Sequence, residues 1–158
     1  MNKQPYVAVC GPANASEQEL EWAEEVGRLI ANAGAVLVCG GLGGVMDAAA
    51  RGCEAAGGLS VGILPGDVRG HASQHLTVAI PTGLGEARNT LVVRAADAVI
   101  AISGEFGTLS EIALALKIGK PVVGLGTWEL AKRGTPVDAI VRADSPLEAA
   151  KKALDLAG

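Results

Sequence analysis

The stretch from residue 98 to residue 125, AVIAISGEFGTLSEIALALKIGKPVVGL, decides the fold class. It begins with a short apolar run at residues 98–102 and ends with a second one at residues 121–125. Between them, residues 109–118 follow a helical pattern that stops at Gly119, and Lys-Pro follows, as is typical after a helix. The stretch therefore predicts a strand, a helix and a second strand, the repeating unit of a parallel α/β sheet.

The same alternation recurs along the rest of the chain. Further Val-, Ile- and Ala-rich runs are typical of strands buried on both faces, at residues 6–10, 35–39, 59–64 and 77–80. Further helices are predicted at residues 16–33, 45–56, 86–96 and 146–156. Ser16 and Glu19 form a capping-box pattern, and Pro146 follows Ser145 at the start of the last helix. We expect one α/β, Rossmann-like domain over residues 1–158, with a mostly parallel sheet of about six or seven strands and helices on both faces.

The composition limits the class of protein. With 158 residues, of which 49% are hydrophobic and 19% charged, the chain can bury a full core. A net charge of −4 disfavours a nucleic-acid surface, which needs clustered Lys and Arg. Charged residues interrupt the apolar stretches well short of the roughly 20 residues that span a membrane. Without an export signal, and with three cysteines that form no CxxC pair, we expect a cytoplasmic protein.

Glycines follow almost every predicted strand, and in an open parallel sheet these turns share the edge where ligands bind. The residues that we expect in a ligand site are Gly11, Gly40, Gly41, Gly43, Gly44, Met46, Thr82, Gly83, Gly85, Arg88, Gly104, Gly107, Thr108 and Glu111. The run from Gly40 to Gly44 opens a helix, so its free N–H groups would attract an anion; alternatively it is a tight turn that needs glycine for geometry alone. Neither GxGxxG after the first strand nor GxxxxGK[ST] occurs, so no NAD site or P-loop is expected.

The second glycine turn, from Gly104 to Thr108, also precedes a helix. Thr108 and Glu111 fit a capping box, and the same carboxylate could contact a ligand instead. Arg88 stands in the first turn of its helix, where a positive charge opposes the helix dipole. A bound phosphate or Glu111 would offset that charge; the alternative is a solvated arginine.

Cysteine and histidine give no metal site. Cys10 and Cys39 end strands, and small apolar core residues are the better interpretation of both. His71 and His75 lie four residues apart in a polar loop with no third ligand nearby, and we interpret this loop as a flap over the site. The helix at residues 109–118 is apolar around most of its circumference, which predicts a subunit interface in a homo-oligomer, a dimer or tetramer.

Four segments carry a resemblance to a known family: CGGLGGVMDAAARG, GILPG, IPTGLGEARNTLVV and GTLSEIALALKIGKPVVGLGT. Together, and in this order, they resemble the molybdenum cofactor carrier proteins and their bacterial relatives. The wider superfamily, known as lysine decarboxylase-like or SLOG, includes the LOG enzymes, which hydrolyse cytokinin riboside monophosphates. LOG enzymes carry an Arg-Lys pair and a PGGxGTxxE motif, and by this resemblance their catalytic arginine falls on Arg88 and their glutamate on Glu111. Gly104, Gly107 and Thr108 then match the phosphate-binding loop.

The chain departs from the LOG motif at three positions, where it has Ser103, Glu105 and Asn89. The resemblance implies a carrier or storage protein that holds the molybdenum cofactor through its phosphate. The first alternative is a LOG-type hydrolase that cleaves the N-glycosidic bond of a nucleoside 5′-monophosphate with Arg88 and Glu111. The second is a nucleotide-sensing module. A carboxylate at Glu105 would repel a phosphate and favours the carrier, and nothing indicates the pyridoxal phosphate lysine that a lysine decarboxylase needs.

Overall fold

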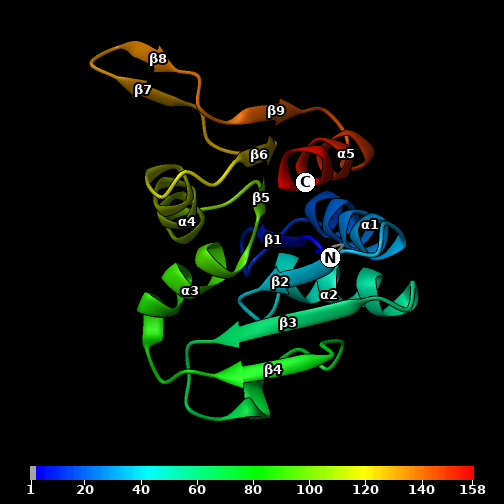
Figure 1. Cartoon of the computed structure of the whole chain (residues 1–158). Helices are drawn as coiled ribbons and strands as arrows, with labels where there is room; N and C mark the ends of the chain where they lie inside the picture. Colours follow the sequence, from blue (N-terminus) through cyan, green and yellow to red (C-terminus); the bar gives the residue numbers. More distant parts are fainter. Residues whose placement is uncertain (1–2) are drawn as a thin grey trace.

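The computed structural model describes residues 3–158. A central parallel sheet forms the middle layer of the molecule (Figure 1). Its seven strands lie in the order β4-β3-β2-β1-β5-β6-β9, and every neighbouring pair is parallel. The strands are β1 (Tyr6–Cys10), β2 (Val36–Cys39), β3 (Leu59–Leu64), β4 (Val78–Pro81), β5 (Ala98–Ile102), β6 (Val122–Leu125) and β9 (Val141–Ala143). The predicted α/β, Rossmann-like fold is confirmed.

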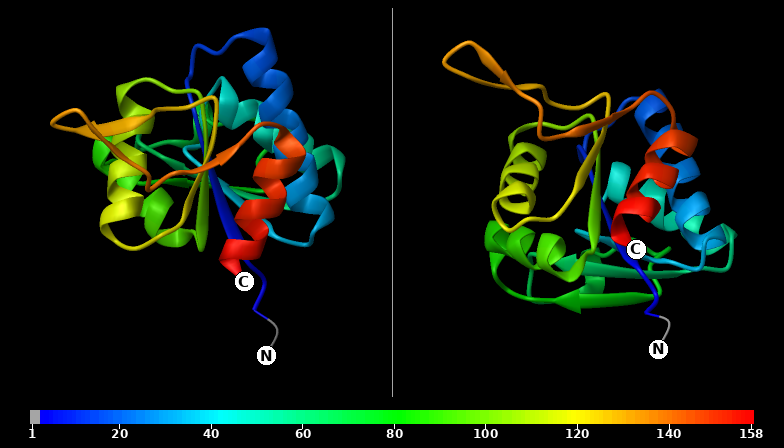
Figure 2. Two further views of the ribbon diagram at one scale, coloured as in Figure 1. Left: turned by 90° about the horizontal axis from the view of Figure 1, so that it is seen from above. Right: turned by 45° about the horizontal axis from the view of Figure 1, so that its top comes forward.

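Helices cover both faces of the sheet (Figure 2). In the described chain they are α1 (Glu17–Asn32), α2 (Val45–Ala55), α3 (Arg88–Ala95), α4 (Phe106–Lys117) and α5 (Pro146–Ala157), with 3-10 turns at Arg69–His71 and Gly85–Ala87. One core lies between the sheet and α1, α2 and α5, and a second core lies between the sheet and α3 and α4. Along β1, Val7 and Val9 enter the first core while Ala8 and Cys10 enter the second, which is why the strand is apolar throughout.

Side-chain caps define the first and last helices. The Oγ of Ser16 accepts a hydrogen bond from the backbone N of Glu19 at 3.2 Å, and the carboxylate of Glu19 accepts one from the backbone N of Ser16 at 3.0 Å. This is the predicted capping box. At α5, the Oγ of Ser145 accepts from the backbone N of Glu148 at 3.1 Å.

The predicted start of α4 is wrong. The helix begins at Phe106 with Glu105 as its N-cap, three residues before the predicted first residue, Leu109. Thr108 is therefore a buried residue inside the first turn, and it cannot cap the helix with Glu111. The reason is that the backbone N of Leu109 already donates to the carbonyl of Glu105 at 3.0 Å, so helical hydrogen bonding begins before Thr108. Gly104 packs closely over Thr108, since an added Cβ would lie 2.3 Å from the Cβ of that residue.

Strand β4 also differs from its prediction, because it is not buried on both faces. It lies at the edge of the sheet and pairs only with β3 among the described strands. Val78 and Ile80 are 46% and 47% exposed. The predicted helix at residues 86–96 begins as a 3-10 turn, and regular α-helix starts only at Arg88.

An antiparallel hairpin, absent from the sequence prediction, projects from the body beside β6 and β9 (Figure 1). It consists of β7 (Leu130–Lys132) and β8 (Thr135–Val137). Strand β9 was not predicted either, and it completes the sheet next to β6. None of the described helices combines the length and the apolar character that a membrane crossing requires.

Candidate functional site

The predicted ligand residues gather at the carboxyl edge of the sheet, and the contact between Gly40 and Arg88 is the centre of the site. Gly40 follows β2, and Arg88 is the first residue of α3. A Cβ built on Gly40 would lie 2.3 Å from Nη1 of Arg88 and 2.7 Å from the sulfur of Met46. A side chain at this position would have to push the guanidinium and the thioether sulfur aside, so the structure brings three of the predicted residues into contact.

Arg88 is anchored to the backbone and is not a freely solvated arginine. Its Nη1 donates hydrogen bonds to the carbonyl of Gly40 and, at 2.7 Å, to the carbonyl of Ile63. Its Nε donates to Oδ1 of Asn89 at 2.8 Å. Burial lowers the pKa of the Arg88 guanidinium, while the nearby Glu111 acts in the opposite direction. The half-buried cation therefore ties the ends of β2 and β3 to the start of α3.

Glu111 lies on α4 within the electrostatic reach of Arg88. Burial raises the pKa of the Glu111 carboxyl to about 7, and Arg88 lowers it by a smaller amount. The same carboxylate contributes to the raised pKa values of Cys10 and Cys39, after burial itself. The site thus holds one anchored cation and one carboxyl group whose protonation changes near neutral pH.

The two cysteines at this edge belong to the core. Cys10 is 2% exposed, and its thiol faces the carbonyl of Ile100 at 3.7 Å. Cys39 is fully buried, and burial raises the pKa of its thiol to about 12. A thiol with such a pKa is not a thiolate near neutral pH, so neither residue has the character of a reactive cysteine.

Glycines also bring the loops of this edge together. A Cβ on Gly11 would lie 2.7 Å from the carbonyl oxygen of Ile102, so the loop after β1 packs directly on the end of β5. Gly44 has a φ of +66°, and a Cβ there would lie 2.3 Å from the carbonyl oxygen of Pro12. Both positions therefore require glycine for packing, independently of any ligand.

The helices that start at the predicted site lack the caps seen elsewhere. Across residues 3–158, side chains cap α1 and α5, whereas α2, α3 and α4 have no side-chain cap hydrogen bond. No side chain therefore serves as the acceptor that Ser16 and Ser145 supply to the other two helices. At α2 the backbone N of Val45 donates instead to the carbonyl of Pro12 at 3.1 Å, and at α3 the backbone N of Arg88 donates into the preceding 3-10 turn. Gly107, in the first turn of α4, has no atom within 4 Å of an added Cβ. The starts of α2 and α4, which follow loops, have the donor pattern that binds anions.

The turn after β4 holds three further predicted residues. The Oγ1 of Thr82 donates to the carbonyl of Leu64 at 2.6 Å and accepts from the backbone N of Leu84 at 3.2 Å. The hydroxyl of Thr82 is therefore used by the turn itself. Gly83 and Gly85 have φ values of +66° and +59°, and an added Cβ on either would meet no atom closer than 4.0 Å.

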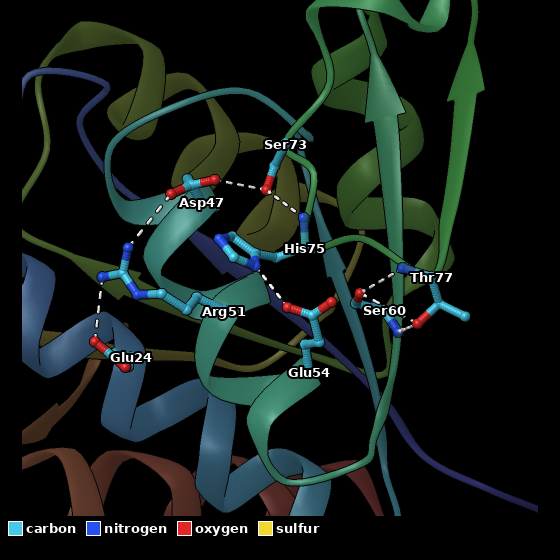
Figure 3. A network of polar contacts seen from close by, with 8 residues as sticks. All are labelled: Glu24, Asp47, Arg51, Glu54, Ser60, Ser73, His75 and Thr77. Carbon is cyan, nitrogen blue, oxygen red and sulfur yellow. Dashed lines mark hydrogen bonds and ion pairs between the residues drawn. The ribbon is translucent and has the colours of Figure 1, made fainter.

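The polar loop that contains His71 and His75 is fastened to the first glycine turn, Gly40 to Gly44, and to α2. Figure 3 shows its contacts with α2. The backbone N of Ser73 donates to the carbonyl of Gly41 at 2.9 Å, and its Oγ donates to Asp47 at 2.6 Å. Nδ1 of His75 lies 2.5 Å from a carboxylate oxygen of Glu54. This loop and residues 42, 43 and 47 line a cavity of about 320 Å³.

The loops after β5 and β6 are also joined. The Oγ1 of Thr127 donates to the carbonyl of Ser103 at 2.5 Å, and Nε1 of Trp128 donates to the carbonyl of Glu105 at 3.3 Å. The ring of Trp128 packs against the ring of Phe106, with 5.8 Å between the centroids. Glu105 itself is exposed at the N-cap of α4. No group of three metal-binding His, Cys, Asp or Glu side chains occurs between residues 3 and 158.

Comparison with known proteins places the chain in a family. A family model described as the SLOG cluster4 family matches residues 4–150. This chain belongs to the SLOG cluster4 family. An uncharacterized protein of Archaeoglobus fulgidus is 44% identical over 119 residues, which cover 75% of this chain and 78% of that protein.

Two solved structures of known ligand class are similar to this SLOG cluster4 protein. The molybdenum cofactor binding protein of Rippkaea orientalis is 36% identical, with a TM-score of 0.90 over 100% of both chains. The molybdenum cofactor carrier protein of Chlamydomonas reinhardtii is 33% identical, with a TM-score of 0.84 over 97% of this chain and 98% of that one. The resemblance predicted from the sequence is confirmed.

Sequence reasoning missed two contacts at the candidate site of this SLOG cluster4 protein. The hydrogen bond between Ser73 and Asp47 joins the polar loop to α2. In the sequence, only the polar character of the loop around Ser73 indicated that this segment could contact other parts of the chain. Trp128 joins the loops after β5 and β6, and the sequence gives no local sign of that contact because its partner, Glu105, lies 23 residues away.

Proposed function

We propose that this protein binds and carries the molybdenum cofactor. The observation that carries the proposal is the likeness to the Rippkaea orientalis molybdenum cofactor binding protein, which extends over the whole of both chains at 36% identity. A likeness of this extent includes the loops at the carboxyl edge of the sheet as well as the strands and helices.

The residues at this edge fit a ligand that bears a phosphate. The uncapped starts of α2 and α4 offer backbone N–H groups, and the positive ends of the two helix dipoles favour an anion. Arg88 adds a positive charge that is already fixed by the carbonyls of Gly40 and Ile63. Little conformational entropy would be lost by this side chain on binding, because its orientation is set before the ligand arrives.

In this proposal Arg88 neutralises the phosphate, and Glu111 controls the net charge beside it. Gly83 and Gly85 leave room for close approach of the ligand, and Gly107 is an exposed residue in the first turn of α4. A carrier needs only to hold and release its cargo. No step of bond cleavage is required of any of these residues.

A LOG-type hydrolase is the second candidate, and one observation favours it. The pKa of Glu111, raised to about 7, would let its carboxyl group exchange a proton near neutral pH, as general acid–base catalysis requires. Glu105 does not separate the two candidates, because an exposed carboxylate at the N-cap of α4 repels the phosphate of either ligand.

One pair of measurements separates the two candidates. Isothermal titration calorimetry of the apoprotein with molybdenum cofactor should give tight binding that weakens at least about tenfold in Arg88→Ala, since a charge-assisted contact is lost. Incubation with AMP should release neither adenine nor ribose 5-phosphate. Release of both products, abolished in Glu111→Gln, would replace the carrier with the hydrolase.

The proposal includes a homo-oligomer, a dimer or tetramer, and a cytoplasmic location. The exposed apolar side chains of Val78 and Ile80 on the edge strand β4 support self-association. No charged residue interrupts the segment from residue 76 to residue 84, although charges are the usual protection of an edge strand. The three cysteines, all buried and free, are in keeping with a reducing compartment.

A further inference from the structure

An aromatic pair, one ring exposed and one partly buried, stands beside the start of α4. The rings of Phe106 and Trp128 lie 5.8 Å apart between centroids, at an interplanar angle of 35°. Phe106 is 76% exposed, the largest exposed fraction among the exposed large hydrophobic residues of the described chain. The whole sequence holds only one Phe, one Tyr and two Trp. Two of the four aromatic residues therefore pair at this edge. Trp128 is partly buried against the second core, whereas core burial does not explain the position of Phe106.

The pair is held in place by the backbone around it. Trp128 donates its indole N–H to the carbonyl of Glu105 at 3.3 Å, and the neighbouring Thr127 donates to the carbonyl of Ser103 at 2.5 Å. Both bonds join the loop after β6 to the loop after β5. The indole ring is thereby oriented before any ligand binds, which lowers the entropy cost of contact with its face.

The pair connects two features that a ligand needs. Phe106 is the first residue of α4 and directly precedes Gly107 and Thr108, whose N–H groups belong to the uncapped start of the helix. Trp128 also lines a cavity of about 660 Å³. The other lining residues come from the end of β6, the β7–β8 hairpin and β9, within residues 124–144. A volume of this size is typical of small-molecule sites.

We propose that Phe106 and Trp128 form a stacking surface for the planar heterocycle of a ligand whose phosphate binds at the start of α4. The inference rests on the proposed function for the phosphate, and it adds the residues that select the ring. A nitrogen heterocycle of the pterin class offers the flat, polarised face that stacks on aromatic side chains in an offset or tilted arrangement. An aliphatic phosphate ester would gain nothing from this surface.

The test uses the fluorescence of Trp128 in a Trp22→Phe background, where it is the sole indole. The probes are neopterin monophosphate, neopterin and inorganic phosphate. Both pterins should quench Trp128, and inorganic phosphate should not.

Because one stacking contact is worth roughly a tenfold change in affinity, neopterin monophosphate should bind about tenfold more weakly to Phe106→Ala and Trp128→Ala by calorimetry. Phe106→Tyr and Trp128→Phe should bind within about threefold of the parent, since both keep an aromatic face.

The control is Leu147→Ala on α5, which removes another strongly exposed apolar side chain, 63% exposed, far along the chain from the pair. It should leave binding unchanged, and circular dichroism of each variant checks that it folds. Unchanged affinity of Phe106→Ala and Trp128→Ala for neopterin monophosphate would overturn the stacking surface and leave the proposed function standing. A smaller mass of Phe106→Ala by light scattering would also overturn it, because the pair would then be a subunit contact. Quenching by neopterin without any binding of molybdenum cofactor would keep the stacking surface and refute the carrier.

Discussion

The guanidinium of Arg88 is hydrogen-bonded to the backbone carbonyl of Gly40, and this contact joins the start of α3 to the glycine loop after β2. A side chain at Gly40 would have to displace this guanidinium, because an added Cβ would lie 2.3 Å from Nη1 of Arg88. The identity of one residue therefore sets the position of the other. The proposed phosphate site depends on this geometry.

Gly40→Ala should displace Arg88 and weaken both folding and ligand binding. Forcing a methyl group into a packed site costs typically about 1–3 kcal/mol of unfolding free energy, measurable by urea denaturation. The matched control is Gly70→Ala, where no atom lies within 4 Å of the added Cβ. Equal stability of the two variants would show that Arg88 and Met46 move aside at little cost, and that Gly40 does not fix the position of Arg88.

Glu111 should make stability depend on pH. Its pKa is raised from 4.5 to about 7 in the folded protein, so the folded state binds a proton more readily than the unfolded state. The stabilising contribution is therefore fully present below the unfolded pKa and is lost as the pH rises through about 7. Denaturant midpoints of the parent protein should fall over this range relative to those of Glu111→Gln, which cannot titrate. Parallel pH profiles of the two proteins would contradict the assignment.

Ser73→Ala should loosen the flap. The substitution removes the 2.6 Å hydrogen bond to Asp47 and the acceptor for the backbone N of His75. Amide hydrogen exchange of residues 71–76 should become faster, with a loss of about 1 kcal/mol of local stability. The control is Gln74→Ala at the neighbouring exposed residue. This substitution leaves the hydrogen bond between Ser73 and Asp47 intact. Unchanged exchange in Ser73→Ala would mean that other contacts hold this loop.

Ile80→Lys should reduce the mass of the homo-oligomer. A lysine on the exposed edge strand β4 places a charge where two copies would meet, and edge strands are blocked in this way in many proteins. Light scattering at micromolar concentration measures the mass, with Leu147→Lys on the exposed face of α5 as the matched charge control. A parent protein that is already monomeric would refute the oligomer, and an Ile80→Lys protein of unchanged mass would refute the role of β4.

Much of the fold could be predicted because its signals are local. Strands β1, β3 and β5 fall at their predicted residues, since apolar runs buried on both faces have few alternatives. The start of α4 could not be predicted, because Thr108 and Glu111 match a capping-box pattern although both lie inside a helix that begins at Phe106. Short strands in residues 130–143 carry no periodicity, and β9 forms through its pairing with β6.

The site could be predicted only in outline. Glycine turns after parallel strands indicate the edge where a ligand binds, and Arg88 lies there as expected. The carbonyl partners of Arg88 lie 48 and 25 residues away in the chain, so no local pattern could indicate them. The pairing of Phe106 with Trp128 depends in the same way on the neighbouring positions of β5 and β6.

Native mass spectrometry of freshly purified protein, from cells that make the molybdenum cofactor, tests the central claim most directly. The account predicts a retained ligand with the mass of the cofactor or its pterin, with molybdenum found in the same fraction by elemental analysis. The retained amount should fall at least about tenfold in Arg88→Ala, since the anchored positive charge is lost. Parent protein that carries neither molybdenum nor a pterin, or that carries a nucleotide instead, would contradict it.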